Sequence, residues 1–158
     1  MSWNPVLNKF IEIKKAFVNK FGKKILWNYD KDKECCLEYW ARLLRDEETN
    51  KILSLLRLAE NDGLLLFHYT DWWDKGETPF WDRYDGFYRE CRSVTIDIFK
   101  DELVHVPFRK FFNLGETDEY SKEQIEEKIL NAKVIEFSNK LDGSMTSARY
   151  YNGRIMLA

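Results

Sequence analysis

The tripeptide Asn61-Asp62-Gly63 separates two parts of the sequence that differ in hydrophobic periodicity. These residue types favour tight turns because they tolerate positive φ or hydrogen-bond their own backbone. Before the tripeptide, apolar residues recur at three- and four-residue spacing, as on one face of a helix. After it, short apolar and alternating segments are typical of strands. The sequence therefore predicts an α+β fold, with a helical N-terminal part over 1–62 and a mainly antiparallel sheet over 63–158.

Three helices are predicted before the turn, over residues 4–21, 33–46 and 49–60. The first begins at Asn4-Pro5 and ends at Gly22, because proline is favoured in the first turn of a helix and glycine directly after the last. The acidic string at 46–48 either separates the second and third helices or lies on the exposed face of one longer helix. The sequence does not decide between these two arrangements.

The second part of the chain is predicted to contain six strands and one helix. In the segment from Cys91 to Phe99, apolar and polar residues alternate, which indicates a strand with two different faces. Asn152-Gly153 predicts a type I′ hairpin, and Ser121 predicts the N-cap of the helix over 122–131. The strands are expected at Leu64–Tyr69, Cys91–Phe99, Leu103–Val106, Val134–Ser138, Met145–Tyr151 and Arg154–Leu157.

Composition limits the classes of protein to consider. No run of about 18 apolar residues occurs, so no membrane span is expected, and no secretory signal is evident at the N-terminus. The three cysteines match neither a disulfide framework nor a zinc pattern, so we expect reduced thiols in a cytoplasmic protein. His68 and His105 lack spaced metal-binding partners and are expected to be ordinary sheet residues, which leaves no predicted metal site.

Two features are compatible with nucleic-acid binding but do not require it. The net charge is −2, yet residues 1–24 hold six lysines and one acid. Such a basic segment either tracks phosphates or forms the solvated face of a helix. The stretch 69–88 is dense in aromatic residues, most of which are expected to pack an ordered loop, with one or two left to contact a substrate.

The segment Lys140-Leu141-Asp142-Gly143-Ser144 lies between two predicted strands and has the residues for covalent nucleotide chemistry. A neutral lysine amine can attack the α-phosphorus of ATP and expel pyrophosphate, which leaves AMP bound as a phosphoramidate. Free lysine has a pKa of about 10.4, so nearby cations or burial must lower it. Glycine at 143 would allow a phosphate to approach the backbone closely. The alternative is a surface turn with a solvated lysine.

Three sequence blocks occur in a fixed order, and together they resemble the phage-type single-strand RNA ligase family, a branch of the covalent nucleotidyltransferases. The resemblance extends over about residues 64–158, whereas residues 1–62 match no known pattern. It implies that 63–158 is the N-terminal portion of an adenylyltransferase domain of ATP-grasp-like fold and that 1–62 is a helical extension. The blocks are Arg89-Glu90-Cys91-Arg92-Ser93-Val94, Pro107-Phe108-Arg109-Lys110-Phe111-Phe112-Asn113-Leu114-Gly115-Glu116 and Lys140-Leu141-Asp142-Gly143-Ser144.

The resemblance implies an ATP-dependent RNA ligase that joins a 5′-phosphate end to a 3′-hydroxyl end, with ATP and Mg²⁺ as cofactors and RNA ends as partners. Lys140 matches the lysine that accepts AMP. Asp142 and Gly143 match the rest of that motif, where the carboxylate helps to position the site near ribose and metal.

The upstream blocks supply the remaining residues of the predicted site. Arg92 and Lys110 match cations that handle the ATP phosphates. Phe112 matches an aromatic residue required near them, and Glu90 lies in the same block as Arg92. We therefore expect Arg92 and Lys110 to lie near Lys140 and to face the triphosphate, with Phe112 and Glu90 among the residues that bind the nucleotide.

The chain departs from the family pattern in two ways. Ser93 stands where the family usually has glycine, which we interpret as a minor change because a small residue fits a strand. The family's later motifs, which supply an acidic metal ligand, an adenine-stacking aromatic and two lysines, follow the nucleophile at a greater distance than the sequence extends. We therefore expect this chain to fold but not to ligate by itself. A DNA-end-joining relative and a non-catalytic nucleotide- or RNA-end-binding module are the alternative interpretations.

Overall fold

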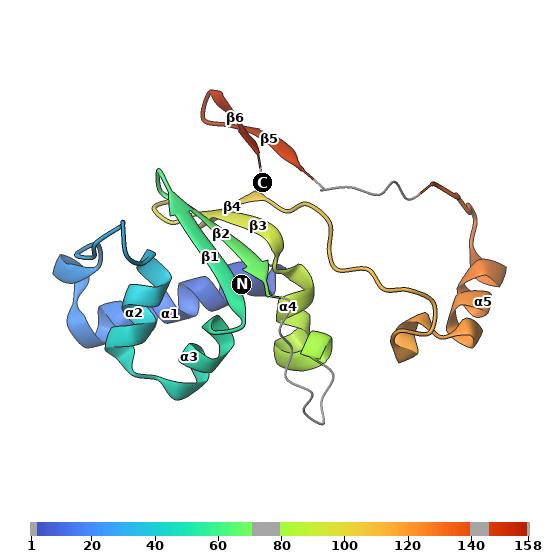
Figure 1. The fold of residues 1–158 in the computed structure, drawn as a ribbon, viewed down its shortest axis with the longest axis horizontal. Coiled ribbons are helices and arrows are strands. Elements are labelled where there is room, and N and C mark those ends of the chain that lie inside the picture. Colours follow the sequence, from blue (N-terminus) through green and yellow to red (C-terminus); the bar gives the residue numbers. More distant parts are fainter. Residues whose placement is uncertain (1–2, 71–79, 140–145, 158) are drawn as a thin grey trace.

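A four-stranded antiparallel sheet follows three helices in the computed structural model, which describes residues 3–70, 80–139 and 146–157 (Figure 1). The strand order is β1-β2-β3-β4, and each strand pairs with the next one along the chain. The predicted α+β class, with helices followed by an antiparallel sheet, is confirmed. The strands of this sheet are β1 Leu56–Asn61, β2 Leu64–Tyr69, β3 Arg92–Asp97 and β4 Glu102–His105.

Helix α1 begins and ends where its capping residues predict. Asn4 Oδ1 accepts hydrogen bonds from the backbone N–H groups of Val6 (2.9 Å) and Leu7 (3.2 Å), and Gly22 ends the helix with a φ of +80°. The predicted helix over 4–21 is therefore confirmed. The α-helices are α1 Pro5–Phe21, α2 Cys36–Leu44, α3 Glu47–Leu53, α4 Phe87–Glu90 and α5 Lys122–Asn131, and short 3₁₀ turns occur at Lys23–Ile25, Phe80–Gly86 and Asp118–Tyr120.

The acidic string at 46–48 separates α2 from α3. Arg45 adopts a left-handed conformation (φ 57°) that ends α2, and the Asp46 side chain accepts a hydrogen bond from the Thr49 N–H (2.8 Å). Asp46 is therefore the N-cap of a new helix, because a carboxylate there satisfies one of the free N–H groups.

The predicted helix over 49–60 is wrong in its second half. Helix α3 ends at Leu53, and β1 begins at Leu56 and pairs along its whole length with β2, from Leu56↔Tyr69 to Asn61↔Leu64. A leucine-rich run fits a helix and a strand equally well when only local spacing is considered. The hydrogen bonds available from β2 decide the outcome.

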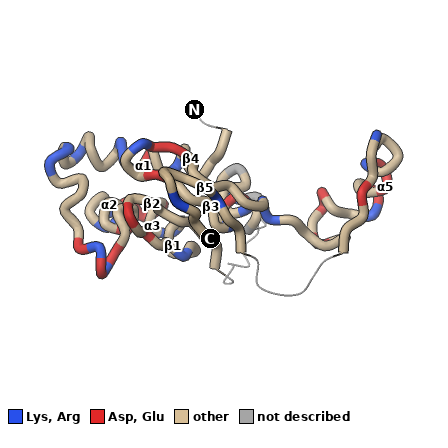
Figure 2. Tube along the Cα trace, turned by 90° about the horizontal axis from the view of Figure 1, so that it is seen from above, with Lys and Arg blue, Asp and Glu red and all other residues tan. Residues whose placement is uncertain are grey.

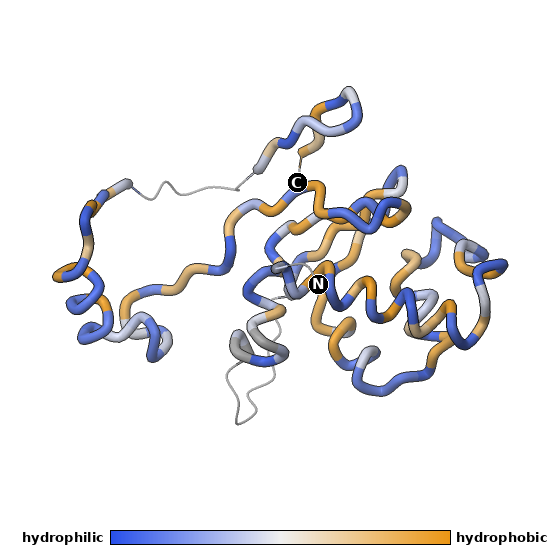
Figure 3. Tube along the Cα trace, turned by 180° about the vertical axis from the view of Figure 1, so that it is seen from behind, coloured by the Kyte–Doolittle hydropathy of each residue, from blue (hydrophilic) through white to orange (hydrophobic). Residues whose placement is uncertain are grey.

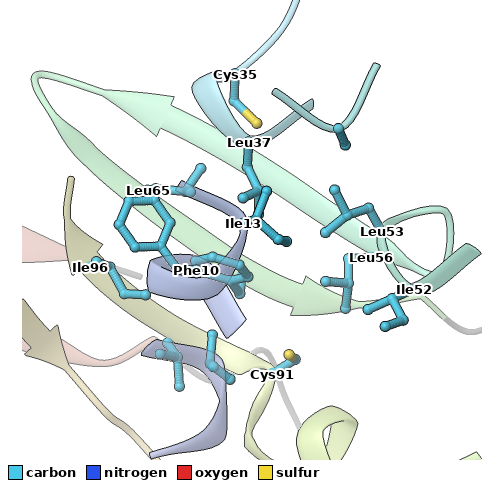
Figure 4. Close-up of a cluster of buried hydrophobic side chains, with 14 of the residues drawn as sticks. Phe10, Ile13, Cys35, Leu37, Ile52, Leu53, Leu56, Leu65, Cys91 and Ile96 are labelled. Atoms are coloured by element: carbon cyan, nitrogen blue, oxygen red, sulfur yellow. The ribbon is translucent and has the colours of Figure 1, made fainter. Parts of the chain in front are cut away.

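Helices α1 and α2 cover one face of the sheet and form the core with it (Figure 4). Phe10 from α1, Leu37 from α2 and Leu65 from β2 are all at most 1% exposed. Trp40 of α2 is fully buried, and its indole N–H donates to the Leu26 carbonyl (2.8 Å). Burying a side chain of this size contributes about 1.5–3 kcal/mol. Because residues on both sides of Gly63 belong to this cluster, the helices and the sheet share one core.

A hairpin of β5 (Ala148–Tyr151) and β6 (Arg154–Leu157) lies against the other face of the sheet. Asn152 and Gly153 join the strands with φ values of 48° and 82°, as the predicted type I′ turn requires. The Tyr151 hydroxyl donates to Asp97 Oδ2 (2.8 Å), and Arg154 pairs with Asp62 (2.8 Å). These two contacts fix the hairpin over β1–β3 and leave a cavity of about 340 Å³ beneath it.

The segment after α5 differs from its prediction. Residues 134–138 form no strand, and Val134 and Phe137 are 73% and 93% exposed. Within the described ranges no neighbouring strand offers backbone partners, because α5 and this segment lie apart from the sheet (Figures 1 and 3). The predicted helix over 122–131 is confirmed, with Ser121 Oγ accepting from the Gln124 N–H (3.3 Å). Both acidic and basic residues occur on this helix (Figure 2).

A bulge interrupts the pairing of β2 with β3. Phe67 pairs with Val94 and His68 pairs with Arg92, so Ser93 between them has no partner. Ser93 adopts a φ of 64°, a left-handed conformation that costs an L-residue other than glycine about 1–2 kcal/mol. The interpretation of Ser93 as a minor change considered only the size of its side chain, whereas the backbone at this position is constrained as well.

Replacing Ser93 with glycine should give a more stable protein than replacing it with alanine, by about 1 kcal/mol, because both variants lose the hydroxyl and only alanine keeps the strain. Urea unfolding of the two variants measures the difference. The matched control is Ser54, which has a φ of −61°, and there alanine should be the more stable. Equal stabilities at Ser93 would show that the bulge carries no strain.

Removing the Tyr151 hydroxyl should weaken the attachment of the β5–β6 hairpin. We expect Tyr151→Phe to lose about 1–3 kcal/mol, since a hydrogen bond to a carboxylate is lost, and amide exchange across 148–157 should accelerate. Tyr150→Phe, at an exposed neighbouring position, is the control and should change neither measurement.

The effect of Tyr151→Phe should depend on pH. Burial alone would raise the pKa of Asp97, but hydrogen bonds from the Lys100 N–H, the Tyr151 hydroxyl and the Phe99 N–H outweigh it and lower the pKa below its ordinary value. The contribution of Asp97 is therefore present above the unfolded-state pKa and is lost as the pH falls through the folded-state pKa. The stability difference between wild type and Tyr151→Phe should shrink in that acid range. A difference independent of pH would contradict this coupling.

Candidate functional site

Two of the three sequence blocks lie side by side at the beginning of β3. The backbone N–H of Lys110 donates to the carbonyl of Arg89 (2.8 Å), which holds the segment 107–116 against the end of α4. Gly86, with a φ of 75°, precedes α4, and an added Cβ there would lie 3.5 Å from Arg109 Nη2. The fold thus brings together residues that are about twenty positions apart in the sequence.

Glu90 forms an ion pair with Arg109, with 2.8 Å between Oε1 and Nε. The Glu90 side chain is 11% exposed and that of Arg109 is 58% exposed. A largely buried carboxylate is stabilised by such a partner. Glu90 therefore fixes the position of the second block, and its charge is already compensated within the fold.

Arg92 lies beside Glu90 in sequence but makes a different kind of contact. Its guanidinium carbon is 4.6 Å from the centre of the Phe111 ring, a cation–π contact. Nη1 is buried and has no hydrogen-bond partner within the part of the chain that the structure describes. Buried charged donors are nearly always hydrogen-bonded. An anion is the kind of group that would satisfy this nitrogen.

Lys110 is held by several contacts within the second block. Its Nζ donates to the Phe111 carbonyl (2.9 Å) and lies 3.6 Å from Glu116 Oε1. Backbone hydrogen bonding from Asn113, together with the charge of Lys110, lowers the pKa of Glu116. A phosphate that approached Lys110 would have to compete with this carboxylate.

Phe112 is largely buried and anchors the second block. Its ring packs against Trp81 (5.9 Å between centroids) and Tyr120 (5.4 Å), and the guanidinium of Arg89 lies 5.0 Å from its centre. Lys110 Nζ is 4.7 Å from the same ring. Its observed contacts are thus all within the protein, and its position holds Lys110 and Arg89 in place.

The two predicted phosphate-handling cations use neighbouring rings. Arg92 contacts Phe111, whereas Lys110 contacts Phe112 and is also 5.3 Å from the Trp81 ring. The structure therefore places the two cations, which come from different segments, against adjacent aromatic rings of the second block. That both of them face one triphosphate stays a prediction.

The predicted nucleophile motif falls outside the described residues, and this applies to Lys140, Asp142 and Gly143. The described chain resumes at residue 146. Ser147 Oγ lies 2.8 Å from His105 Nε2, which holds the chain after the motif against β4. Because β4 pairs with β3, the exit from the motif is attached to the same sheet that carries Arg92.

Three residues of this region were not singled out by sequence reasoning, namely Arg109, Phe111 and Trp81. Arg109 and Phe111 lie inside the second sequence block, which the sequence analysis identified. Their contacts with Glu90 and Arg92 were not predicted. Trp81 belongs to the aromatic stretch at 69–88, and its contact with Phe112 agrees with the expectation that most of these rings pack the protein.

The histidines, cysteines and acids show no metal site within the described ranges, where no group of three or more such residues is placed to hold an ion. His68 lies in β2, 3.3 Å from Ser93 Oγ, and His105 lies in β4, as predicted. The three cysteines are free and buried, and burial raises the pKa of the Cys35 thiol to about 12. Among the described helices, none has both the length and the apolar character to cross a membrane.

Comparison with known proteins relates this chain to an RNA ligase. The chain is 32% identical over 116 residues to a protein of Thermovibrio ammonificans that bears the name "Putative RNA ligase". The aligned region covers 73% of this chain and 27% of that protein, so the chain spans about a quarter of the relative's length. No family model matches the chain, and no solved structure matches it. The likeness supports an RNA ligase relationship.

Proposed function

We propose that this chain is part of an ATP-dependent RNA ligase that joins 5′-phosphate and 3′-hydroxyl ends through a covalent AMP on Lys140. In this proposal residues 63–158 are the N-terminal portion of the adenylyltransferase domain, and 1–62 are a helical extension. The proposal is supported by the order of the three sequence blocks and by the likeness to the relative named as an RNA ligase.

The observation that carries the proposal is the state of Arg92. Its neighbour Glu90 is paired with Arg109, so no carboxylate of that block neutralises the Arg92 guanidinium. A buried guanidinium nitrogen without a partner in the described chain is costly for a folded protein. Binding a phosphate there would satisfy the nitrogen and neutralise the charge, as a site for a triphosphate requires.

In the proposed reaction the neutral amine of Lys140 attacks the α-phosphorus of ATP. The N–P bond forms, the bond to the bridging oxygen breaks, and pyrophosphate leaves with the electron pair of that bond. The amine proton passes to solvent or to a neighbouring base. Arg92 and Lys110 would lower the pKa of the attacking amine and stabilise the departing pyrophosphate. Mg²⁺ bound to the triphosphate would screen its charge.

The first test is covalent labelling of the full product of the gene that encodes this chain. With radioactive ATP and Mg²⁺, we expect one AMP per molecule on Lys140, found by peptide mapping. Lys140→Arg should abolish the label, because arginine keeps its charge but is effectively never deprotonated. The matched control is Lys133→Arg, a change at an exposed lysine seven positions earlier, which should leave the label intact.

Each outcome of this experiment decides between the interpretations. Label that persists in Lys140→Arg would show that another group is the nucleophile. Tight ATP binding without a covalent product would favour a non-catalytic module. Labelled protein that seals nicked or broken DNA, but not RNA, would favour the DNA-end-joining alternative.

The second test concerns Arg92. Arg92→Ala should slow AMP transfer by about 100- to 1,000-fold, as expected when one preorganised charge-stabilising group is removed. The free energy of unfolding should change by less than about 1 kcal/mol, since the described fold loses only the cation–π contact with Phe111. Arg57→Ala, at an exposed position of β1 in the same sheet, is the control for a general loss of positive charge. An equal loss of rate in both variants, or a large loss of stability in Arg92→Ala, would contradict the proposed role.

A further inference from the structure

A groove of about 450 Å³ runs along β4, between the N-terminal end of the chain and β5. The groove is lined by Trp3, by Leu103–Val106, and by Ala148 and Arg149 of β5. This volume lies within the range of sites for small organic groups. The residues come from the helical part, the sheet and the hairpin, so the groove exists only in the assembled fold.

An exposed aromatic ring and an unpaired cation distinguish this groove. Trp3 is 74% exposed, which is unusual for so large an apolar side chain. Within the described residues Arg149 has no ion-pair partner, whereas Arg154 on the next strand is paired with Asp62. None of the residues that line the groove is acidic.

His105, which also lines the groove, adds hydrogen-bonding capacity rather than charge. Burial lowers the pKa of its imidazole below the ordinary value, and the nearby charge of Arg149 lowers it further. The ring is therefore neutral at neutral pH. Its Nε2 lies 2.8 Å from Ser147 Oγ. Among the described residues that line the groove, Arg149 therefore supplies the positive charge.

We propose that this groove binds one unpaired nucleotide of a single-stranded nucleic acid, with the base stacked on Trp3 and a phosphate at Arg149. Each element of the groove matches a part of that ligand. An aromatic ring stacks on the π-face of any base, and a guanidinium binds a phosphate. The apolar side chains of Leu103, Val104 and Val106 would cover the ribose and the base edge. An unpaired strand is required, because a base inside a duplex does not expose its face.

The position of the groove connects it with the proposed function, on which this inference rests. Arg149 follows Ser147 by two residues, and Ser147 lies just beyond the Lys140–Ser144 motif. Arg149, which would hold the phosphate, therefore follows the predicted AMP-accepting lysine closely in the sequence. In this proposal the groove guides an RNA end toward that lysine. This also assigns a role to the helical extension, because Trp3 belongs to it.

The lysines of residues 1–24 contribute less to such binding than their number indicates. Lys14 donates to the Ile98 carbonyl (2.9 Å) and pairs with Asp101, and Lys9 pairs with Glu12. Lys20 donates to the Leu44 carbonyl (3.1 Å). Half of these lysines are thus used in the fold, which leaves Arg149 as the cation best placed for a nucleotide at Trp3.

The test measures the affinity of the 158-residue chain for a fluorescently labelled, unstructured ten-nucleotide RNA, by anisotropy at low salt and without ATP. Trp3→Ala should weaken binding at least about fivefold, since stacking of one base on an aromatic ring contributes about 1–3 kcal/mol. Arg149→Gln should weaken binding and reduce its dependence on salt, because one phosphate contact is lost. Trp3→Phe and Arg149→Lys should retain most of the affinity.

Two matched controls separate this site from general effects of surface change. Phe137→Ala removes an aromatic ring that is 93% exposed outside the groove, and Arg57→Gln removes an exposed arginine of β1 outside the groove. Neither should change the affinity. If the controls weaken binding as much as the groove variants, or if Trp3→Ala and Arg149→Gln bind like wild type, the proposal is wrong.

Further arms identify the ligand. If DNA of the same sequence binds and the variants weaken its binding in the same pattern, the result supports recognition of the base and the phosphate. If RNA binds more strongly than DNA, the result supports the same recognition with an added contact to the ribose. If the groove variants weaken ATP binding and leave oligonucleotide binding unchanged, the groove is a mononucleotide site and the proposal is overturned. Because these measurements need neither ATP nor Lys140, RNA binding through the groove, together with a full gene product that never accepts AMP, would refute the ligase proposal alone.

Discussion

The packing of α1 against the inner face of the sheet is the interaction on which the other features depend. Phe10 and Phe17 of α1 are fully buried, and both approach Trp40 of α2, with ring centroids 5.6 and 6.1 Å apart. Leu65 and Ile96 complete this layer from β2 and β3 (Figure 4). Once β3 is fixed in this way, its first residue, Arg92, is fixed as well. The site therefore rests on a rigid element, which favours preorganised binding.

The sheet uses its two faces differently. The inner face is apolar and belongs to the core, whereas the outer face carries Thr95 and Asp97, which are nevertheless only 4% and 6% exposed. Asp97 is covered because Tyr151 of the hairpin reaches it, and a buried carboxylate needs such donors. The polar side chains of β3 are thus covered by the hairpin that follows the Lys140 motif and do not face water. Asp97 helps to position this hairpin.

The elements that the sequence predicted correctly are those with local signals. Asn4, Gly22 and Asn152-Gly153 act through their own backbone or that of near neighbours, so the bounds of α1 and the hairpin turn follow from the sequence. The strand β1 and the absence of a strand at 134–138 depend on whether a partner strand is available, which local periodicity does not contain. The ion pair of Glu90 with Arg109 likewise joins residues that are distant in the sequence, so local periodicity does not predict it. The sequence blocks identified the segments of the site, but not the partners within them.

Among the described residues around the start of β3, ion pairs neutralise several acids but leave Arg92 without an acidic partner. Glu90, Glu116 and Glu119 are paired with Arg109, Lys110 and Arg89. The first pair joins the end of α4 to the second block, the second lies within that block, and the third joins α4 to the segment that follows it. Arg92 is left without an acidic partner in the described chain, and only an aromatic ring covers it. A cation–π contact stabilises a guanidinium without neutralising it, so the charge stays available to a phosphate. Under the proposed function, the surrounding ion pairs contribute indirectly, since they hold the nearby carboxylates on other cations and away from the Arg92 guanidinium.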